Sequence, residues 1–248
     1  MAKETISGGA SSIMPDMRPR FLDHVTAPVD RAEVLRYLGY PVDAAPNREL
    51  RELLDHWIAE AEERALPRAV FAGFPIAKIG KQCLHLKTTC GAAKFHGAIG
   101  EFLGMARQIV AFIATAGPKV ELLASQLMRK GEHLDALIVS AVGSERAEAA
   151  EIAVIEQLRD QSRVTGLVPT LPYSPGYCGI ALSEQITLFE LFESNTVGVS
   201  LTADCLMKPL KSVSGLIGLG LSEDVQQYGS PCDRCELQNC NMRRSSAK

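Results

Sequence analysis

The chain has 248 residues, of which 46% are hydrophobic and 22% charged, the usual balance for a globular protein with a packed core. Its formal net charge of -3 gives no basic field of the kind that binds phosphate backbones, so nucleic acid is not expected as a partner. No run approaches the roughly 18 apolar residues of a membrane span, and residues 1–12 lack a secretory signal pattern, so we expect a cytoplasmic protein without membrane contact.

The first part of the chain predicts two helices followed by mixed structure. Residues 1–25 are polar and contain several glycines and serines, which indicates a flexible N-terminal arm. Asp30 and Asn47 are typical N-cap residues and predict two helices, of which the first ends near Tyr37 and the second before Pro67. Further on, composition and spacing predict strands at 69–74 and 79–86, a helix at 94–106 and a continuous apolar central strand at 108–115.

The second part predicts long helices and then short elements. Two helices are expected at 119–130 and 133–159, separated by Gly131. Beyond them the pattern predicts an amphipathic helix at 182–193 and strands at 197–202 and 212–219. Helices and strands do not alternate regularly, so we expect an α+β fold with a twisted antiparallel or mixed sheet and long helices.

Cysteines are concentrated near the C-terminus, where Cys232, Cys235 and Cys240 lie close together. In a reducing compartment such crowding points to metal rather than to disulfides. Three thiolates need a fourth ligand, for which Cys178 in its glycine-rich turn is the preferred donor, Cys205 the second choice and a non-protein ligand a third option. An iron–sulfur cluster, of the 4Fe–4S type, is the favoured interpretation, and structural zinc and uncoordinated thiols are the alternatives.

A succession of short motifs carries more information than any single residue. The sequence SPGYCG at 174–179 is followed by the amphipathic helix, by GVSLTAD at 198–204, by MKP at 207–209 and by SVSG at 212–215. This order and spacing resemble the activation domain of cobalamin-dependent methionine synthase, with a weaker likeness back to residue 94. The turn cysteine and the terminal cysteines are similar to those of stand-alone members of that family. On this basis the chain divides into the arm at 1–25, a helical and β subregion at 26–93, an activation-domain-like core at 94–225 and a cysteine-cluster tail at 226–248.

The resemblance implies a function in the reductive reactivation of a corrinoid-dependent methyltransferase. The family's domain docks over cobalamin on a partner, either a corrinoid-binding protein or a cobalamin-dependent methyltransferase, and S-adenosylmethionine is the candidate methyl donor. The resemblance also implies that Tyr177, the turn tyrosine, approaches the cobalamin and takes part in catalysis. Ser174, Gly176, Tyr177 and Glu148 are the expected cofactor-binding residues.

Sequence adjacency suggests a route for electrons in such a system. With Cys178, Cys232, Cys235 and Cys240 as ligands, a cluster would lie beside Tyr177 and could relay electrons from an external donor protein to the corrinoid. Three other hypotheses stay open: a non-redox corrinoid-docking module with structural zinc, a methyltransferase subunit, and an iron–sulfur protein of an unrelated pathway.

One position departs from the family pattern. The family has an arginine just ahead of the Pro-Gly-Tyr turn, where its guanidinium can form a bidentate hydrogen bond with a carboxylate. Here Pro172 holds that place, and Arg163 is the nearest upstream arginine. Either Arg163 reaches the site, or the methyl-donor site is altered or lost.

Overall fold

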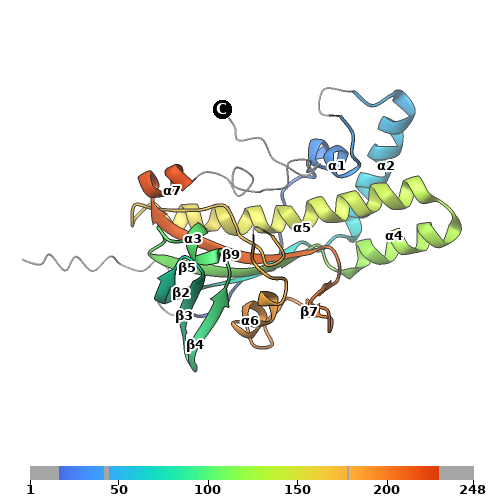
Figure 1. Ribbon diagram of the computed structural model, residues 1–248. Coiled ribbons are helices and arrows are strands. Elements are labelled where there is room, and N and C mark those ends of the chain that lie inside the picture. The colour runs from blue at the N-terminus through green and yellow to red at the C-terminus, as the bar shows by residue number, and fades with distance from the viewer. Residues whose placement is uncertain (1–16, 42–44, 178, 229–248) are drawn as a thin grey trace, which may run out of the picture.

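The computed structural model describes residues 17–41, 45–177 and 179–228, and it confirms the expected α+β class. Within these residues, seven strands form one sheet in the order β4-β3-β2-β5-β9-β6, with β1 on β2 and every pairing antiparallel (Figure 1). Its strands are β1 (Arg20–Leu22), β2 (Arg68–Gly80), β3 (Cys83–Thr88), β4 (Gly91–His96), β5 (Gln108–Thr115), β6 (Leu167–Pro169) and β9 (Ser212–Leu221). The helices are α1 (Arg31–Tyr37), α2 (Arg48–Arg64), α3 (Ile99–Phe102), α4 (Pro118–Lys130), α5 (His133–Ser162), α6 (Glu184–Glu190) and α7 (Ser222–Tyr228), and a separate pair joins β7 (Ser200–Leu201) to β8 (Met207–Lys208).

Strand β5 is the centre of the sheet and is buried along its whole length. Side chains alternate across a strand, so its two sets of residues enter different clusters. Val110, Phe112 and Ala114 belong to the cluster that includes α5, and the intervening isoleucines and alanine belong to the cluster on the opposite face. Both faces of the sheet are therefore covered, which explains why this segment reads as an uninterrupted apolar run.

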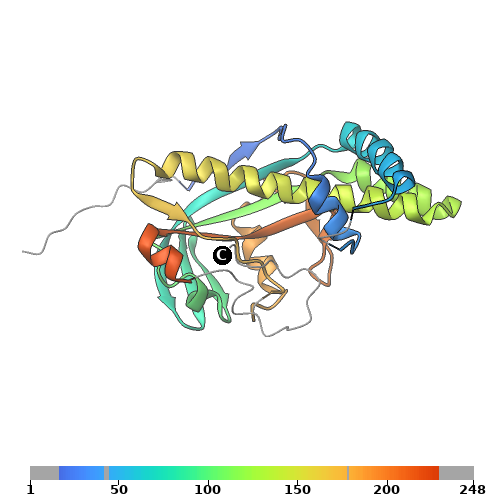
Figure 2. The same ribbon diagram turned by 90° about the horizontal axis from the view of Figure 1, so that it is seen from above.

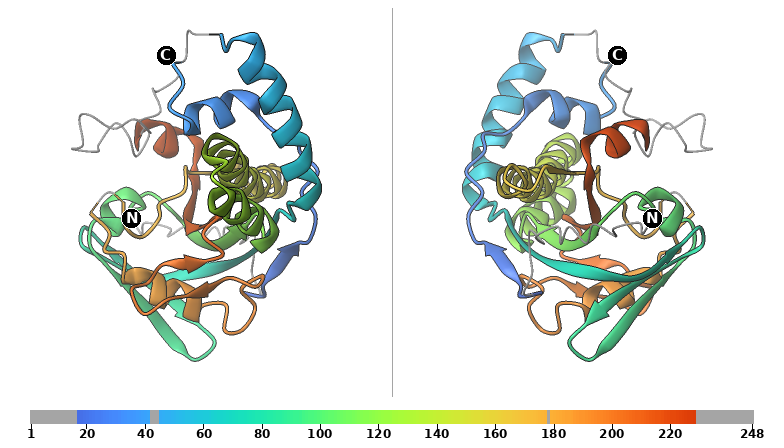
Figure 3. Two further views of the ribbon diagram at one scale, coloured as in Figure 1. Left: turned by 90° about the vertical axis from the view of Figure 1, so that its right-hand side faces the viewer. Right: turned by 90° about the vertical axis from the view of Figure 1, so that its left-hand side faces the viewer.

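Helix α5 is the main support of one face of the sheet. Its 30 residues span about 45 Å at 1.5 Å per residue. Its C-terminal half packs on the sheet through Ala150, Val154 and Leu158, while its N-terminal half packs against α1, α2 and α4 (Figures 2 and 3). The long helix thus joins the sheet to a helical subcluster.

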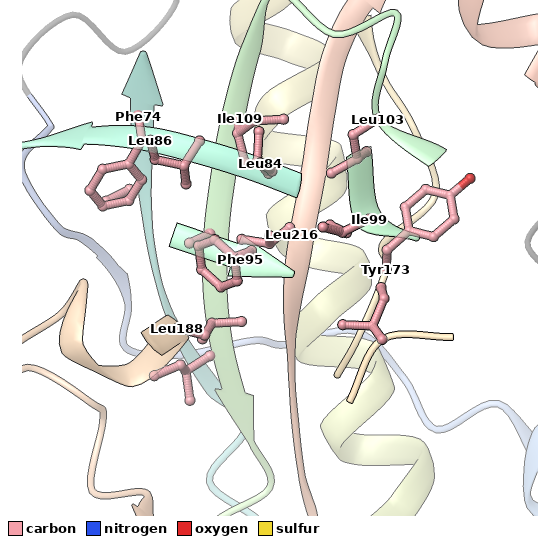
Figure 4. Packing of buried hydrophobic residues seen from close by; sticks show 14 of the residues in the cluster. Phe74, Leu84, Leu86, Phe95, Ile99, Leu103, Ile109, Tyr173, Leu188 and Leu216 are labelled. Atoms are coloured by element: carbon pink, nitrogen blue, oxygen red, sulfur yellow. The ribbon is translucent and has the colours of Figure 1, made fainter. Parts of the chain in front are cut away.

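The opposite face of the sheet is covered by α3, α6 and irregular segments. Phe95, Leu188 and Leu216 lie in this cluster together with Tyr173, which comes from the segment after β6 (Figure 4). The ring of Tyr173 stacks on Phe102 with the ring centroids 4.9 Å apart. These contacts bring the motif segment onto β9 and α3.

A buried ion pair on α5 fixes the approach to α1. Arg146 and Glu145 are 2% and 4% exposed, and their side chains pair with Arg146 Nε 2.6 Å from Glu145 Oε2. Arg146 also donates to the carbonyls of Ala27 and Pro28, and Glu145 accepts from the backbone N–H of Asp30. The segment that leads into α1 is therefore tied to α5 by charge-assisted hydrogen bonds.

Most of the sequence-predicted elements are confirmed, and the exceptions have a physical cause. The caps Asp30 and Asn47 accept hydrogen bonds from the first turns of α1 and α2, as predicted. The helix expected at 94–106 is wrong, because residues up to His96 form β4 and only Ile99–Phe102 is helical. The same apolar residues serve here as the inward side of a hairpin strand and of one helical turn. The strand expected at 79–86 is instead the end of β2 and the start of β3, joined by a turn at 81–82. The strand expected at 197–202 is reduced to Ser200–Leu201.

In the described part of the chain, no helix combines the length and the apolar character needed to cross a bilayer.

Candidate functional site

Residues 174–177 form a tight turn at the surface. The N–H of Tyr177 donates to the carbonyl of Ser174 at 3.2 Å, and the N–H of Gly176 donates to the carbonyl of Ile180 at 2.8 Å. Gly176 has a φ of 91°, which a residue with a side chain rarely adopts. The side chain of Tyr177 is 71% exposed. The turn therefore presents an aromatic ring that the described part of the chain leaves exposed.

Both ends of the turn are anchored to the fold. On one side, Tyr173 exchanges two backbone hydrogen bonds with Leu216 of β9, at 2.9 and 3.0 Å. On the other side, the carbonyl of Gly179 faces the loop between β4 and α3 and accepts from the N–H of Ala98 at 3.5 Å. A Cβ on Gly97 would lie 2.6 Å from that carbonyl oxygen, so a glycine is needed for the close approach. The position of Tyr177 thus depends on Gly97.

The variant Gly97→Ala is expected to lower the free energy of unfolding by about 2–4 kcal/mol, because it adds both backbone strain and a clash. Gly131→Ala is the matched control, since Gly131 has a φ of 84° against 88° for Gly97 but nothing within 4 Å of its added Cβ. The control should lose only about 1–2 kcal/mol. Chemical denaturation measures both values. Equal losses would show that the contact with Gly179 adds nothing.

A cavity of about 260 Å³ lies beside the turn. It is lined by Ser174, Pro175, Tyr177, Leu182, Gln185, Leu206, Met207, Leu210, Ser212, Val213 and Ser214. Of the expected cofactor-binding residues, it therefore brings together Ser174 and Tyr177, and Gly176 lies between them in the same turn. The cavity is smaller than the roughly 300–1,000 Å³ of typical small-molecule pockets. It can therefore hold one portion of a small-molecule ligand, or a side chain of a partner.

The serines of the SVSG motif stabilise the walls of this cavity. The hydroxyl of Ser214 donates to the side-chain oxygen of Gln185 at 3.2 Å, in a buried contact that ties β9 to α6. The hydroxyl of Ser212 lies 2.9 Å from Thr115 Oγ1 and 2.8 Å from the carbonyl of Pro209. Both serines are buried, so their hydroxyls serve the fold and are not free for chemistry.

Exposed apolar side chains surround the cavity. Leu206 and Leu210 line it and are 50% and 60% exposed, and Tyr177 stands at the same site. We call these three residues the apolar rim. Contiguous exposed apolar surface beside a cavity is typical of a contact site for a partner.

Glu148 lies apart from the cavity, on α5. It accepts a hydrogen bond from the hydroxyl of Tyr37 in α1, and its carboxylate lies 3.8 Å from the guanidinium of Arg36. Burial raises the pKa of Tyr37, and the hydrogen bond to Glu148 raises it further, so the hydroxyl keeps its proton and remains a donor. Glu148 is only partly buried, and its charge suits a cationic ligand group.

Comparison with known proteins decides the family. The family described as "Vitamin B12 dependent methionine synthase, activation domain" matches residues 98–228, which is more than half of the chain. The chain belongs to this family. A solved structure described as the MetH reactivation domain bound to AdoHcy superposes with a TM-score of 0.67 at 18% sequence identity, over 84% of this chain and 80% of that one. At this identity the likeness shows the fold. No curated protein sequence matches the chain.

The resemblance drawn from the motifs between 174 and 215 is thus confirmed, and Glu148 and the Tyr177 turn lie within the matched range of the activation domain. The expected metal ligands lie elsewhere: Cys178, Cys232, Cys235 and Cys240 fall outside the described residues, so that site stays a prediction. Among the residues that are described, no three His, Cys, Asp or Glu side chains are grouped as metal ligands.

The structure does not place Arg163 at the cavity beside the turn, where the family arginine would be expected. Its side chain is 81% exposed and pairs with Asp160 at 3.0 Å. Tyr37 donates to the expected site residue Glu148, and Gln185 lines the cavity and accepts from Ser214. Neither residue was found from the sequence, because each reaches its partner from another element. No local spacing marks either residue, so only the fold could reveal them.

Proposed function

We propose that this activation domain takes part in the reactivation of a cobalamin-dependent methyltransferase by docking its apolar rim on a corrinoid-binding partner. The observation that carries the proposal is Tyr177, which is 71% exposed on an anchored turn beside the cavity, within the family's matched range. An exposed aromatic residue with apolar neighbours, on a turn held by backbone hydrogen bonds, is suited to act as an anchor at an interface. Leu206 and Leu210 supply the neighbouring surface.

The reaction that this docking would serve has two steps, a one-electron reduction and a methyl transfer. Cobalt(II) corrinoid takes up one electron to become cobalt(I), which attacks the methyl group of S-adenosylmethionine. The carbon–sulfur bond breaks, a carbon–cobalt bond forms, and S-adenosylhomocysteine leaves. The donor's identity is supported by the solved relative described as bound to AdoHcy, which is this leaving product. Glu148 is proposed to bind the donor, and Ser174, Gly176 and Tyr177 to contact the cofactors.

The electron is proposed to reach the corrinoid from an external donor protein through a cluster on Cys178, Cys232, Cys235 and Cys240. Thiolate-bound clusters supply the low reduction potentials that this chemistry requires. The described neighbours of Cys178, Tyr177 and Gly179, are both exposed, so ligands from another part of the chain can approach the turn. Thiolates are also the donor type that such clusters take.

Metal analysis after anaerobic purification tests the cluster. The full chain is expected to carry about four irons and four sulfides and to give a paramagnetic signal after reduction. Cys235→Ser should lose most of the iron, whereas Cys90→Ser, at an exposed thiol of the β3–β4 hairpin, should keep it. Zinc without sulfide would contradict the cluster and favour the non-redox docking module. Failure of the cluster would leave the docking proposal to be tested separately.

A further inference from the structure

A half-buried lysine lies next to the predicted donor-binding helix face, and no carboxylate of the described residues forms an ion pair with it. Lys211 immediately precedes β9, and its ammonium donates to the hydroxyl of Ser144 on α5 at 2.9 Å. Its stem packs on Gly143, where a Cβ would come within 3.0 Å of Lys211 Cγ. Among the described residues, no acidic oxygen lies within ion-pair distance of this ammonium. An ammonium placed in this way against a neutral hydroxyl has lost hydration without gaining a counter-ion.

The surroundings of Lys211 keep the ammonium in place. The hydroxyl of Ser144 donates to the carbonyl of Ser140, so its lone pairs remain to accept from Lys211. Burial lowers the pKa of Lys211, and the nearby charge of Glu121 opposes this effect only in part. The carboxylate of Glu121 is itself engaged by the backbone N–H of Leu210 at 2.7 Å. The lysine is therefore a fixed cation whose desolvation an anionic ligand would offset.

A second charge lies one helical turn away. Ser144 and Glu148 are four residues apart on α5, which places their Cβ atoms about 6 Å from each other on one face. Lys211 and Glu148 thus present a positive and a negative group along one strip of the helix. An amino acid carries an ammonium and a carboxylate on the same carbon and matches such a pair.

Resting on the proposed function, we propose that Lys211, oriented by Ser144, binds the carboxylate of the amino-acid part of S-adenosylmethionine or S-adenosylhomocysteine, while Glu148 binds its ammonium. Lys211 would then supply the positive charge that the family's arginine provides and that Pro172 replaces in this chain. The proposal concerns only the amino-acid part of the ligand, so this part and the nucleoside can be tested separately.

Calorimetric titration of the full chain with S-adenosylhomocysteine and with 5′-methylthioadenosine tests the proposal. The second ligand has the same nucleoside and thioether but no amino-acid group. Lys211→Met should weaken S-adenosylhomocysteine binding about 10- to 100-fold, the effect of one charge-assisted hydrogen bond, and leave methylthioadenosine binding unchanged. Lys211→Arg should restore most of the affinity, and Ser144→Ala should give a smaller loss of the same selectivity.

The other outcomes distinguish the assignment of Lys211 from the proposal that the chain binds the methyl donor. If the wild type binds S-adenosylhomocysteine and Lys211→Met binds it equally well, the assignment of Lys211 is overturned and donor binding stands. A loss that is equal for both ligands would also overturn it, because a structural effect would not distinguish the carboxylate. If the wild type binds neither ligand, the donor part of the proposed function fails. Methionine preserves the apolar contact with Gly143 and removes a charge that forms no ion pair with the described residues, so the variant should fold.

Discussion

Arg146→Met is expected to lower the free energy of unfolding by about 3–5 kcal/mol, the usual cost of breaking a buried ion pair by removing one partner. The substitution leaves the carboxylate of Glu145 buried and removes both hydrogen bonds to the carbonyls of Ala27 and Pro28. The effect should extend to α1, because Asp30 at its start is held by the same pair. Thermal unfolding would show a fall in Tm of roughly 10 °C for a chain of this size.

A double variant separates the ion pair from the packing of the side chain. Glu145→Gln combined with Arg146→Met removes both charges, so its loss of stability should be clearly smaller than the sum of the two single losses. Exposed Arg48, which pairs with Glu52 on the surface of α2, is the matched control, and Arg48→Met should cost less than about 1 kcal/mol. A loss below 1 kcal/mol for Arg146→Met itself would show that the pair does not hold the approach to α1.

Placing aspartate at both leucines of the apolar rim, Leu206→Asp with Leu210→Asp, is expected to weaken docking on a corrinoid partner by at least about 100-fold. Two charges would then be desolvated at the contact surface without partners, at about 1–3 kcal/mol or more each. Both side chains are at least half exposed, so the fold should not change. A cobalamin-loaded corrinoid-binding domain of a methionine synthase is a suitable probe, and interferometry gives the Kd.

Leu134→Asp provides the control for this surface. Leu134 is 52% exposed and lies in the first turn of α5, where an acidic residue is favourable. Docking should be unaffected by this change. If both variants bind the probe as the wild type does, the apolar rim is not the contact surface.

The sequence predicted the fold best where local chemistry and tertiary packing agree. Asp30 and Asn47 cap helices in any context, and the apolar run at 108–115 fits only a strand covered on both faces. The prediction failed at 94–106, where helical spacing of apolar residues coincided with the pairing of β4 on β3. Strand pairing is a non-local property, and no local pattern could exclude the helix.

The candidate site was predicted only in part, because its residues come together from distant segments. The motif order located the turn of Tyr177 and the strand β9, which do line one cavity. The motif could not show that Ser212 and Ser214 are buried structural residues, nor that Tyr37 binds Glu148. No local pattern distinguishes Lys211 from other lysines in the sequence, because its significance lies in its contact with Ser144 and in the lack of a described counter-ion.

The most direct test of the central claim is the rate of methylcobalamin formation on the corrinoid-domain probe, followed by absorbance under anaerobic conditions. The reaction contains cobalt(II) corrinoid on its protein, S-adenosylmethionine, a low-potential chemical reductant and the full chain. We predict that the chain raises the rate at least tenfold, about 1.4 kcal/mol of barrier, and that the variant with aspartate at Leu206 and Leu210 does not. An unchanged rate in the presence of the wild-type chain would contradict a function in reactivation.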